Sequence, residues 1–385
     1  MKRKILFISH SSEKSGAPRV LLDVAESLSE KEYDLTFCLP EDRGIAHEIR
    51  NKGYNLIFCY NPQKGLRDKT GLGSLMTLII NKLKFMKNIR AIIAKGSFDL
   101  VYINSIASLF AGIALIGKGN KILWHLHEDL KPCRINRLKC WLVTKISDKI
   151  LFVSPSNLSC FPKSLKTIPH EILPNGIDIQ SMESFSPDKQ YRTRFEYKET
   201  DNIIATLSYI SHRKGIDVFL KALPLVFEDY ENAKAVIPGD KSGADPKYLE
   251  KIEEIQKAPE LKNHVFFPGF CSNIPSFLDC VNVFVLPSRN DPMPLAVLEA
   301  MAMRKAIVAT DVGSLKQMID PPHAGIIVPP EDPPALAKAI LNLLKNPSLR
   351  HKMGNAAKQR IQRHYSRQIF QKRIIEIISN ILENR

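Results

Sequence analysis

Two carboxylates separated by seven residues give the sequence its clearest chemical signal. Asp291 follows an apolar run, and Glu299 falls about one turn into the helix that the segment LAVLEAMAM predicts. A carboxylate presents two acceptor oxygens, which suit the neighbouring hydroxyl groups of a sugar. Pro294 or Leu295 can open the helix, so that its free N–H groups face a bound anion. We therefore expect one carboxylate to hold a sugar and the other a ribose.

Paired carboxylates have a second chemistry, because they can be the acid and the base of glycoside hydrolysis. The strand, the Pro-broken loop and the apolar helix around Asp291 favour a nucleotide site instead. A structural role for carboxylates at the start of a helix is the remaining alternative.

Two adjacent cations precede the start of another predicted helix. Arg213 and Lys214 follow the apolar run NIIATLS and stand directly before Gly215. Ligands of open α/β sheets bind beyond the carboxyl ends of the strands, which is where these side chains fall. A paired positive charge there would neutralise a diphosphate and the charge that develops as it leaves. The alternative, a plain basic pair in a first helical turn, is electrostatically unfavourable.

The N-terminal half has candidates of its own at strand ends. Gly16 precedes a helix, where it lets backbone N–H groups approach a phosphate, although an ordinary tight turn explains it equally well. His127 ends the run KILWHLH and would contact a sugar hydroxyl or a phosphate. The string His125-x-His127-x-Asp129 also resembles a metal-ligand cluster, but no second His pair follows, and we expect no metal. A structural histidine is the alternative for His125.

These residues must be positioned by short β-rich runs that alternate with helical patterns, as in a doubly wound parallel sheet. The runs are KILFIS, YDLTFCLP, YNLIFCY, FDLVYINS, KILWHLH and KILFVS, followed by NIIATLS, AKAVIP, HVFFPG, NVFVLP, KAIVAT and GIIVPP. Turn-forming residues near 175–195 separate the two series. We predict an α/β protein with two Rossmann-like domains, 1–180 and 181–365, whose parallel sheets face a central cleft. The helix 366–385 is expected to pack back on the first domain.

The charge of the chain is uneven. Its formal net charge is +15, and residues 1–180 carry +11 of it. Residues 61–90 combine Lys and Arg with apolar residues at near-helical spacing, which suits a helix on an anionic membrane surface or, equally, a solvated helix face. No run has the roughly 18 apolar residues of a membrane-spanning helix. The first residues indicate a strand rather than a signal peptide, so we expect a cytoplasmic protein.

At this point the motifs resemble the retaining GT-B glycosyltransferases of glycosyltransferase family 4, also called glycosyl transferases group 1. The resemblance runs along nearly the whole chain. It is clearest in PNGID (174–178), RKGID (213–217), FPGF (267–270) and the block 287–313, whose two acidic residues separated by seven form a highly specific signature.

The resemblance implies a role for each candidate. Glu299 would bind the ribose, and Asp291 with the following backbone would bind the donor sugar and phosphates. Lys214 would bind the diphosphate, with Arg213 as a second phosphate contact. The resemblance implies further contacts with the donor. Gly16 would pack against the donor, and His127 would lie near the sugar. The base would be contacted by Pro268, Gly269 and Phe270, and the backbone after Asp291 that binds the donor comprises Met293, Pro294 and Leu295. Many members have Glu where this chain has Asp291, a difference that puts the donor sugar in doubt.

We therefore expect a hexosyltransferase that moves a sugar from a UDP- or GDP-sugar to a saccharide or lipid-linked acceptor, without a metal or other cofactor, in polysaccharide or glycolipid biosynthesis. One alternative is a nucleotide-sugar epimerase or phosphorylase on the same fold. Another is a non-catalytic protein that binds an anionic polymer. Nucleic acid is not an expected partner, because no basic stripe interleaved with aromatic residues is found.

Overall fold

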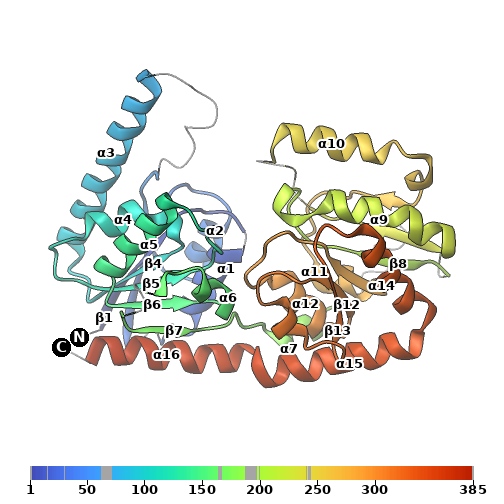
Figure 1. Ribbon diagram of the computed structural model, residues 1–385. Helices are drawn as coiled ribbons and strands as arrows, with labels where there is room; N and C mark the ends of the chain where they lie inside the picture. The colour runs from blue at the N-terminus through green and yellow to red at the C-terminus, as the bar shows by residue number, and fades with distance from the viewer. Residues whose placement is uncertain are drawn as a thin grey trace. The chain divides into compact units, whose positions relative to one another are not determined.

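The computed structural model describes residues 2–14, 16–29, 31–61, 72–163, 167–186, 197–198, 200–239, 241 and 244–383, with the side chains of 72–75 left aside. The chain divides into two compact units (Figure 1). The first unit comprises Met1–Asn175 and Phe370–Arg385, and the second comprises Gly176–Ile369. Each unit is built on its own parallel sheet.

The first unit contains a seven-stranded parallel sheet with the order β3-β2-β1-β4-β5-β6-β7. Its strands are β1 (Arg3–Ser9), β2 (Tyr33–Leu39), β3 (Asn55–Phe58), β4 (Leu100–Asn104), β5 (Lys121–Leu126), β6 (Lys149–Phe152) and β7 (His170–Ile172). The strand order reverses at β1, which pairs with both β2 and β4. Such a reversal opens a ligand site beyond the carboxyl ends of the strands.

Helices connect these strands. They are α1 (Gly16–Glu26), α2 (Ile45–Asn51), α3 (Leu72–Gly96), η1 (Ile106–Ser108), α4 (Leu109–Ala114), α5 (Arg134–Ile146) and α6 (Pro155–Ser159). Right-handed crossovers place α1 and α2 on one face of the sheet and the later helices on the other. Accordingly, α1 packs against α2, and α4 packs against both α3 and α5.

The second unit contains a six-stranded parallel sheet with the order β10-β9-β8-β11-β12-β13. Its strands are β8 (Asn202–Ala205), β9 (Ala233–Val236), β10 (Val265–Phe266), β11 (Val283–Leu286), β12 (Ala306–Thr310) and β13 (Gly325–Val328). The sheet reverses its order at β8, which lies between β9 and β11. Both sheets therefore have the doubly wound topology that the alternating runs predict.

The helices of the second unit cover both faces of its sheet. They are α7 (Ile179–Glu183), η3 (His212–Lys214), α9 (Ile216–Asp229), α10 (Pro246–Gln256), η4 (Pro259–Leu261), α11 (Ile274–Asp279), α12 (Leu295–Ala302), α13 (Leu315–Ile319), α14 (Pro333–Lys345), α15 (Pro347–His364) and the start of α16 (Arg367–Glu383). α9 packs against α10 and α14, whereas α12 packs against α7, α11 and α15.

Each unit has its own apolar core. The central strands are buried on both faces, as helices on each side of a parallel sheet require. Every residue of β4, β11 and β12 is buried. Continuous apolar runs such as VFVL therefore form strands here rather than helical turns.

All twelve predicted runs form strands, and the predicted α/β class is confirmed. One strand was not predicted: β7 is only three residues long and reads His-Glu-Ile. A run this short shows no apolar periodicity, and it is held by parallel pairing with β6.

The helix expected within residues 61–90 is α3, which begins at Leu72; residues 62–71 of that prediction lie outside the described part. Among the described helices, none is both long enough and apolar enough to cross a membrane.

Candidate active site

The sheet of the second unit gathers several strand-end loops at one edge. Because β8 and β12 both neighbour β11, the segments that follow these three strands lie side by side. Arg213 and Lys214 belong to η3 after β8, and Asp291 belongs to the loop between β11 and α12. Parallel strands thus bring two candidates far apart in the sequence to one place.

Lys214 and Asp291 form an ion pair at this edge. Lys214 Nζ lies 2.5 Å from Asp291 Oδ2, and Arg213 Nη1 lies 3.6 Å from Asp291 Oδ1. Asp291 is only 5% exposed, so these cations rather than water compensate its charge. Burial lowers the pKa of Lys214, the Asp291 carboxylate raises it, and the Arg213 charge lowers it. Arg213 and Lys214 together carry one positive charge more than Asp291 neutralises, and this excess charge can bind an anion.

Two glycines permit these loops to approach closely. Gly215 has a φ of 68°, and a Cβ there would lie 1.9 Å from the carbonyl oxygen of Pro287. Gly313, with a φ of 58°, approaches Asp291 in the same way, because its Cβ would lie 1.8 Å from that residue's carbonyl oxygen. Only glycine combines a positive φ with the space that these contacts leave.

Glu299 is buried on α12, where it is 3% exposed. The helix begins at Leu295 with Pro294 in the preceding N-cap position, which confirms the predicted start. Met293, directly before it, is buried as well. α12 therefore carries Glu299 away from the loop of Asp291 by about one helical turn.

The FPGF turn follows β10, two strands away from β8 in the sheet order. Gly269 has a φ of 80°, and its carbonyl oxygen accepts a hydrogen bond from Gly239 N at 2.9 Å. Pro268 is half-buried, whereas Phe270 is 64% exposed. The turn thus presents backbone atoms and one open aromatic ring at the same edge of the sheet as Lys214.

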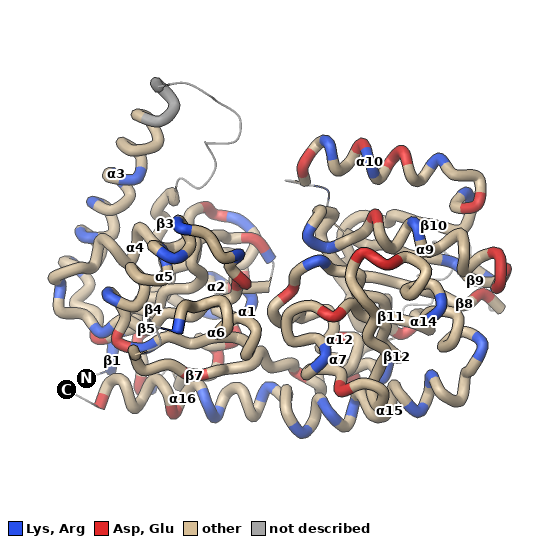
Figure 2. Tube along the Cα trace, in the orientation of Figure 1, with Lys and Arg blue, Asp and Glu red and all other residues tan. Residues whose placement is uncertain are grey.

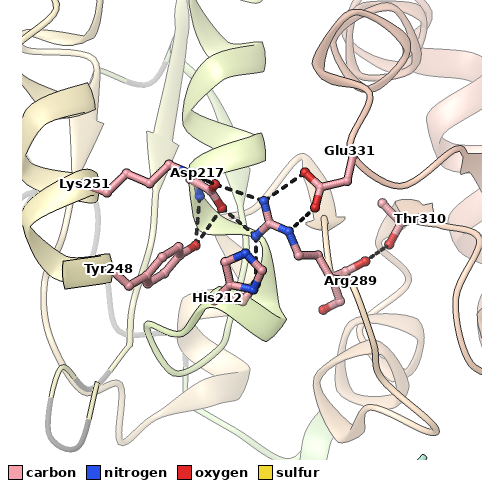
Figure 3. A network of polar contacts seen from close by, with 8 residues as sticks. His212, Asp217, Tyr248, Lys251, Arg289, Thr310 and Glu331 are labelled. Carbon is pink, nitrogen blue, oxygen red and sulfur yellow. Dashed lines mark hydrogen bonds and ion pairs between the residues drawn. The ribbon is translucent and has the colours of Figure 1, made fainter. Parts of the chain in front are cut away.

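Arg289 is a site-forming residue that the sequence analysis did not identify (Figure 3). Its guanidinium binds both carboxylate oxygens of Asp217, at 2.7 and 2.9 Å. It also binds the Glu331 carboxylate and donates to the carbonyl oxygen of His212 at 2.7 Å. Arg289 thereby holds the loop between β11 and α12 to three other segments: the start of α9, the η3 turn and the loop after β13.

Asp217 is the buried centre of this network. It accepts further hydrogen bonds from Tyr248 Oη at 2.8 Å and Lys251 Nζ at 2.6 Å. Burial alone would raise its pKa, but these donors and the Arg289 guanidinium lower it well below its usual range. Asp217 is 1% exposed, and both of its carboxylate oxygens are hydrogen-bonded. It holds the Arg289 guanidinium in place, which in turn binds the carbonyl oxygen of His212 in η3.

The first unit holds Gly16 and His127, and one asparagine links His127 to Ala17, the residue after Gly16. His127 Nε2 lies 2.8 Å from Asn104 Oδ1, and Asn104 Nδ2 donates to the carbonyl oxygen of Ala17 at 3.0 Å. Gly16 is the first residue of α1. The ends of β1, β4 and β5, which are adjacent in the sheet, therefore bring these two candidates into one neighbourhood.

The histidines at this edge are held neutral by burial. Burial is the main cause that lowers the pKa of His127, and the neighbouring His125 and His10 lower it further. Burial also lowers the pKa of His10, against the opposing effect of Glu128. A neutral imidazole can donate one hydrogen bond and accept another, as contact with sugar hydroxyls requires.

The His125-x-His127-x-Asp129 string does not converge on one point. His125 Nδ1 lies 2.6 Å from Tyr102 Oη, and Asp129 Oδ2 accepts a hydrogen bond from Ser156. His127 is bound to Asn104 instead. Across the described residues, no three His, Cys, Asp or Glu side chains are grouped to hold a metal ion.

The structure brings together Arg213, Lys214 and Asp291 in the second unit, and Gly16 and His127 in the first. No role was predicted from the sequence for Asn104 or Arg289, although both lie near the end of a predicted strand. Asn104 is the last residue of β4 and lies within the run FDLVYINS, and Arg289 follows NVFVLP. Attention to every polar residue at a strand end would have found both.

Two family models match consecutive parts of the chain. The model of the family Glycosyltransferase Family 4 matches residues 14–181, and that of Glycosyl transferases group 1 matches residues 188–360. Together the two matches span most of the sequence and fall on the two sheets in turn.

Curated relatives and solved structures agree. The lipopolysaccharide core biosynthesis mannosyltransferase LpcC of Rhizobium leguminosarum bv. viciae is 24% identical over 59% of this chain, which spans 62% of that protein. The human alpha-1,3/1,6-mannosyltransferase ALG2 is 23% identical over 99% of this chain and 97% of its own length. A crystal structure of Anabaena Alr3699/HepE in complex with UDP and glucose superimposes with a TM-score of 0.83 at 20% identity, covering 98% of this chain and 99% of that one. The chain belongs to the GT-B glycosyltransferases of family 4 and is a transferase enzyme.

Proposed function

We propose that this enzyme transfers a sugar from a UDP- or GDP-sugar to a saccharide or lipid-linked acceptor, with retention of anomeric configuration and without a metal ion. The observation that carries the proposal is the cluster of Lys214, Arg213 and Asp291 at the strand-end edge of the second sheet. It offers a buried carboxylate and a surplus of positive charge at the position that the resemblance to family 4 assigns to the nucleotide sugar.

The reaction breaks the bond between the anomeric carbon and the diphosphate oxygen, and the acceptor oxygen forms its bond to that carbon on the same face. The electron pair of the broken bond stays on the diphosphate, and the proton of the acceptor hydroxyl passes to the departing phosphate oxygen. Lys214 and Arg213 would stabilise the negative charge on that oxygen as it develops. A cation already desolvated by burial needs little reorganisation for this task.

The remaining candidates would hold the donor. Glu299 would bind the ribose hydroxyls through its two carboxylate oxygens, and Asp291 would bind the sugar together with the backbone that follows it. That backbone comprises Met293, Pro294 and Leu295, and the FPGF turn (Pro268, Gly269 and Phe270) would contact the base. In the first unit, His127 is proposed to contact a sugar hydroxyl and Gly16 a phosphate.

The acceptor is proposed to belong to polysaccharide or glycolipid biosynthesis, the setting that the name of LpcC describes for that relative. A net charge of +11 in residues 1–180 favours an anionic or lipid-linked acceptor. The proposal includes a cytoplasmic location with peripheral attachment to the membrane face.

The test begins with thermal-shift measurements against UDP-, GDP- and ADP-sugars, since a ligand of the folded state raises the melting temperature. Turnover of the best donor is then followed by NMR with an acceptor panel, which reports the anomeric configuration of the product. We expect Glu299→Ala to weaken donor binding and Glu299→Gln, which keeps one acceptor oxygen, to weaken it less. Full turnover by the Ala variant would disprove the ribose assignment, and an inverted product would disprove retention.

A further inference from the structure

The first unit exposes apolar side chains on α3 that its core does not use. Met76, Ile79, Ile80 and Leu83 are each between 47% and 61% exposed, and their spacing places them on one face of the helix. The residues of α3 that pack into the core lie on the other side and further along the chain: Phe85, Ile89 and Ile93. The N-terminal half of α3 therefore carries a second apolar stripe, turned to solvent.

α5 repeats the same arrangement. Ile135, Leu138 and Trp141 are 69%, 56% and 44% exposed, and they follow one another at helical spacing. Arg134 and Arg137 lie beside them and are exposed too. The helix packs into the core through a different side, which Cys140 and Val143 form.

Both stripes lie toward the same edge of the sheet. A helix that follows a parallel strand starts at the carboxyl end of that strand and runs back along the sheet. The N-terminal halves of α3 and α5 therefore lie at the edge that carries His127, and Figure 1 shows α3 running on beyond the sheet. α4 packs against both helices, and Lys82 Nζ of α3 lies 4.2 Å from the ring centroid of Phe110 on α4.

The charges of these helices have one sign. α3 contains five Lys or Arg residues and α5 contains four, and neither helix contains an Asp or Glu (Figure 2). Burial lowers the pKa of Lys82 on α3, and the charge of Lys139 on α5 lowers it further. The acidic residues that precede α5, Glu128 and Asp129, are engaged by Ser105 and Ser156, and Asp148, which follows α5, accepts a hydrogen bond from Ile122 N. An anionic surface would relieve this repulsion.

We infer that the α3–α5 surface, defined as the exposed stripes of α3 and α5 with their Lys and Arg side chains, docks the first unit onto an anionic lipid bilayer. Apolar side chains would enter the headgroup region, and the cations beside them would meet lipid phosphates. A solvated helix face does not explain seven large apolar side chains left in water. This docking rests on the proposed peripheral attachment to the membrane, and the α3–α5 surface is the part of the chain that would contact the lipid. Docked in this way, the edge bearing His127 would face a lipid-linked acceptor.

The test uses the full chain and two kinds of vesicle, one of phosphatidylcholine alone and one of phosphatidylcholine and phosphatidylglycerol in equal amounts. The chain has two tryptophans: Trp124 is fully buried, and Trp141 lies in the proposed surface. A blue shift of tryptophan emission on adding vesicles therefore reports Trp141. We expect sedimentation with the anionic vesicles, a blue shift, and loss of both at raised salt.

Variants locate the surface. Replacing Arg134 or Arg137 by Ala should weaken vesicle binding about fivefold each, and Leu138→Ser should weaken it about tenfold. The matched controls are Leu225→Ser on α9, whose side chain is 40% exposed, and Lys338→Ala on α14. Both should bind vesicles as the unaltered chain does.

Two results would overturn the inference. The first is no binding to either vesicle, which would indicate that the α3–α5 surface binds a protein partner instead of lipid. The second is equal vesicle binding by all variants. Thermal shifts with UDP and GDP are measured on the same samples. A variant that keeps its nucleotide shift and loses vesicle binding separates docking from the proposed catalytic role.

Discussion

We expect the ion pair of Lys214 and Asp291 to rearrange when a diphosphate binds. Lys214 Nζ satisfies a carboxylate that is 5% exposed. A diphosphate would attract the same ammonium group, and Arg213, which is half-exposed, can then take over part of the Asp291 charge. The diphosphate of the donor would thus compete with Asp291 for Lys214 instead of binding to cations that have no partner.

This arrangement predicts a large effect on catalysis when the buried cation is removed. Lys214→Ala should lower kcat/KM by about two to three orders of magnitude, as loss of a charge-stabilising donor does. It should also lower the free energy of unfolding, because Asp291 loses its nearest cation. Steady-state kinetics with the best donor and urea unfolding measure the two effects. Lys221→Ala, on the exposed side of α9, is the matched control and should change neither.

The buried histidines predict that the first unit loses stability in mild acid. Burial lowers the pKa of His125 to about 3, whereas an unfolded His titrates near 6.5. Below pH 6.5 the His125 side chain takes up a proton in the unfolded chain but stays neutral in the folded chain. The free energy of unfolding is therefore retained above about pH 6.5 and falls as the pH drops. For this one group the loss between pH 7 and pH 5 is about 2 kcal/mol.

Urea unfolding of the unaltered chain and of His125→Asn at both pH values checks this. The replacement removes the titrating group, so the pH dependence should shrink even though the cavity it leaves lowers stability at both values. His351→Asn, on the exposed surface of α15, should keep the full pH dependence. An unchanged slope in His125→Asn would show that other groups cause the acid sensitivity.

At the scale of elements, the site depends on glycines that let loops touch. Gly215→Ala combines a positive φ with a Cβ placed 1.9 Å from the carbonyl oxygen of Pro287. Gly53→Ala, after α2, is the matched control, since its φ is 76° but nothing lies within 4 Å of the added Cβ. We expect a loss of about 1 kcal/mol for Gly53→Ala from backbone strain alone, and of about 3 kcal/mol for Gly215→Ala.

Because the clash would move η3 away from Pro287, Gly215→Ala should also reduce turnover, whereas Gly53→Ala should not. Urea unfolding and initial rates on the same preparations measure both effects. Equal stability loss in the two variants would mean that strain, rather than contact between the loops, sets the requirement for glycine.

The elements were predictable because their signals are local. A strand of a parallel sheet needs a short run of apolar residues, and each of the twelve predicted runs contains at least three in a row. The loops after these strands supplied Lys214, Asp291 and His127 as candidates, and the structure places Lys214 beside Asp291. Arg289 escaped because its importance comes from Asp217 and Glu331, whose distance from it in the sequence hides a contact that only the sheet order creates.

At the scale of the whole molecule, the chain passes between its units twice, once after Asn175 and once after Ile369. The second passage occurs inside α16, so one continuous helix belongs to both units. From Phe370 onward it serves the first unit, where Arg373 Nη2 donates to the carbonyl oxygen of Ile172 in β7 at 2.8 Å. The part of α16 from Phe370 to Glu383 therefore belongs to the same unit as β1.

This connectivity predicts that the C-terminal helix sets the stability of the N-terminal sheet. Ile374 is fully buried on α16 and its neighbour Ile375 is 38% exposed, so the two provide the same substitution in different surroundings. Ile374→Ala should lower the free energy of unfolding by about 2 to 4 kcal/mol, and Ile375→Ala by less than about 1 kcal/mol.

Both tryptophans, Trp124 and Trp141, belong to the first unit, so tryptophan emission follows that unit during urea unfolding. Its transition should move to lower urea in Ile374→Ala and stay in place in Ile375→Ala. A transition that both variants leave unchanged would show that the first sheet is stable without α16. A shift confined to Ile374→Ala would show that residues more than 350 positions from β1 in the sequence are part of the same cooperative core.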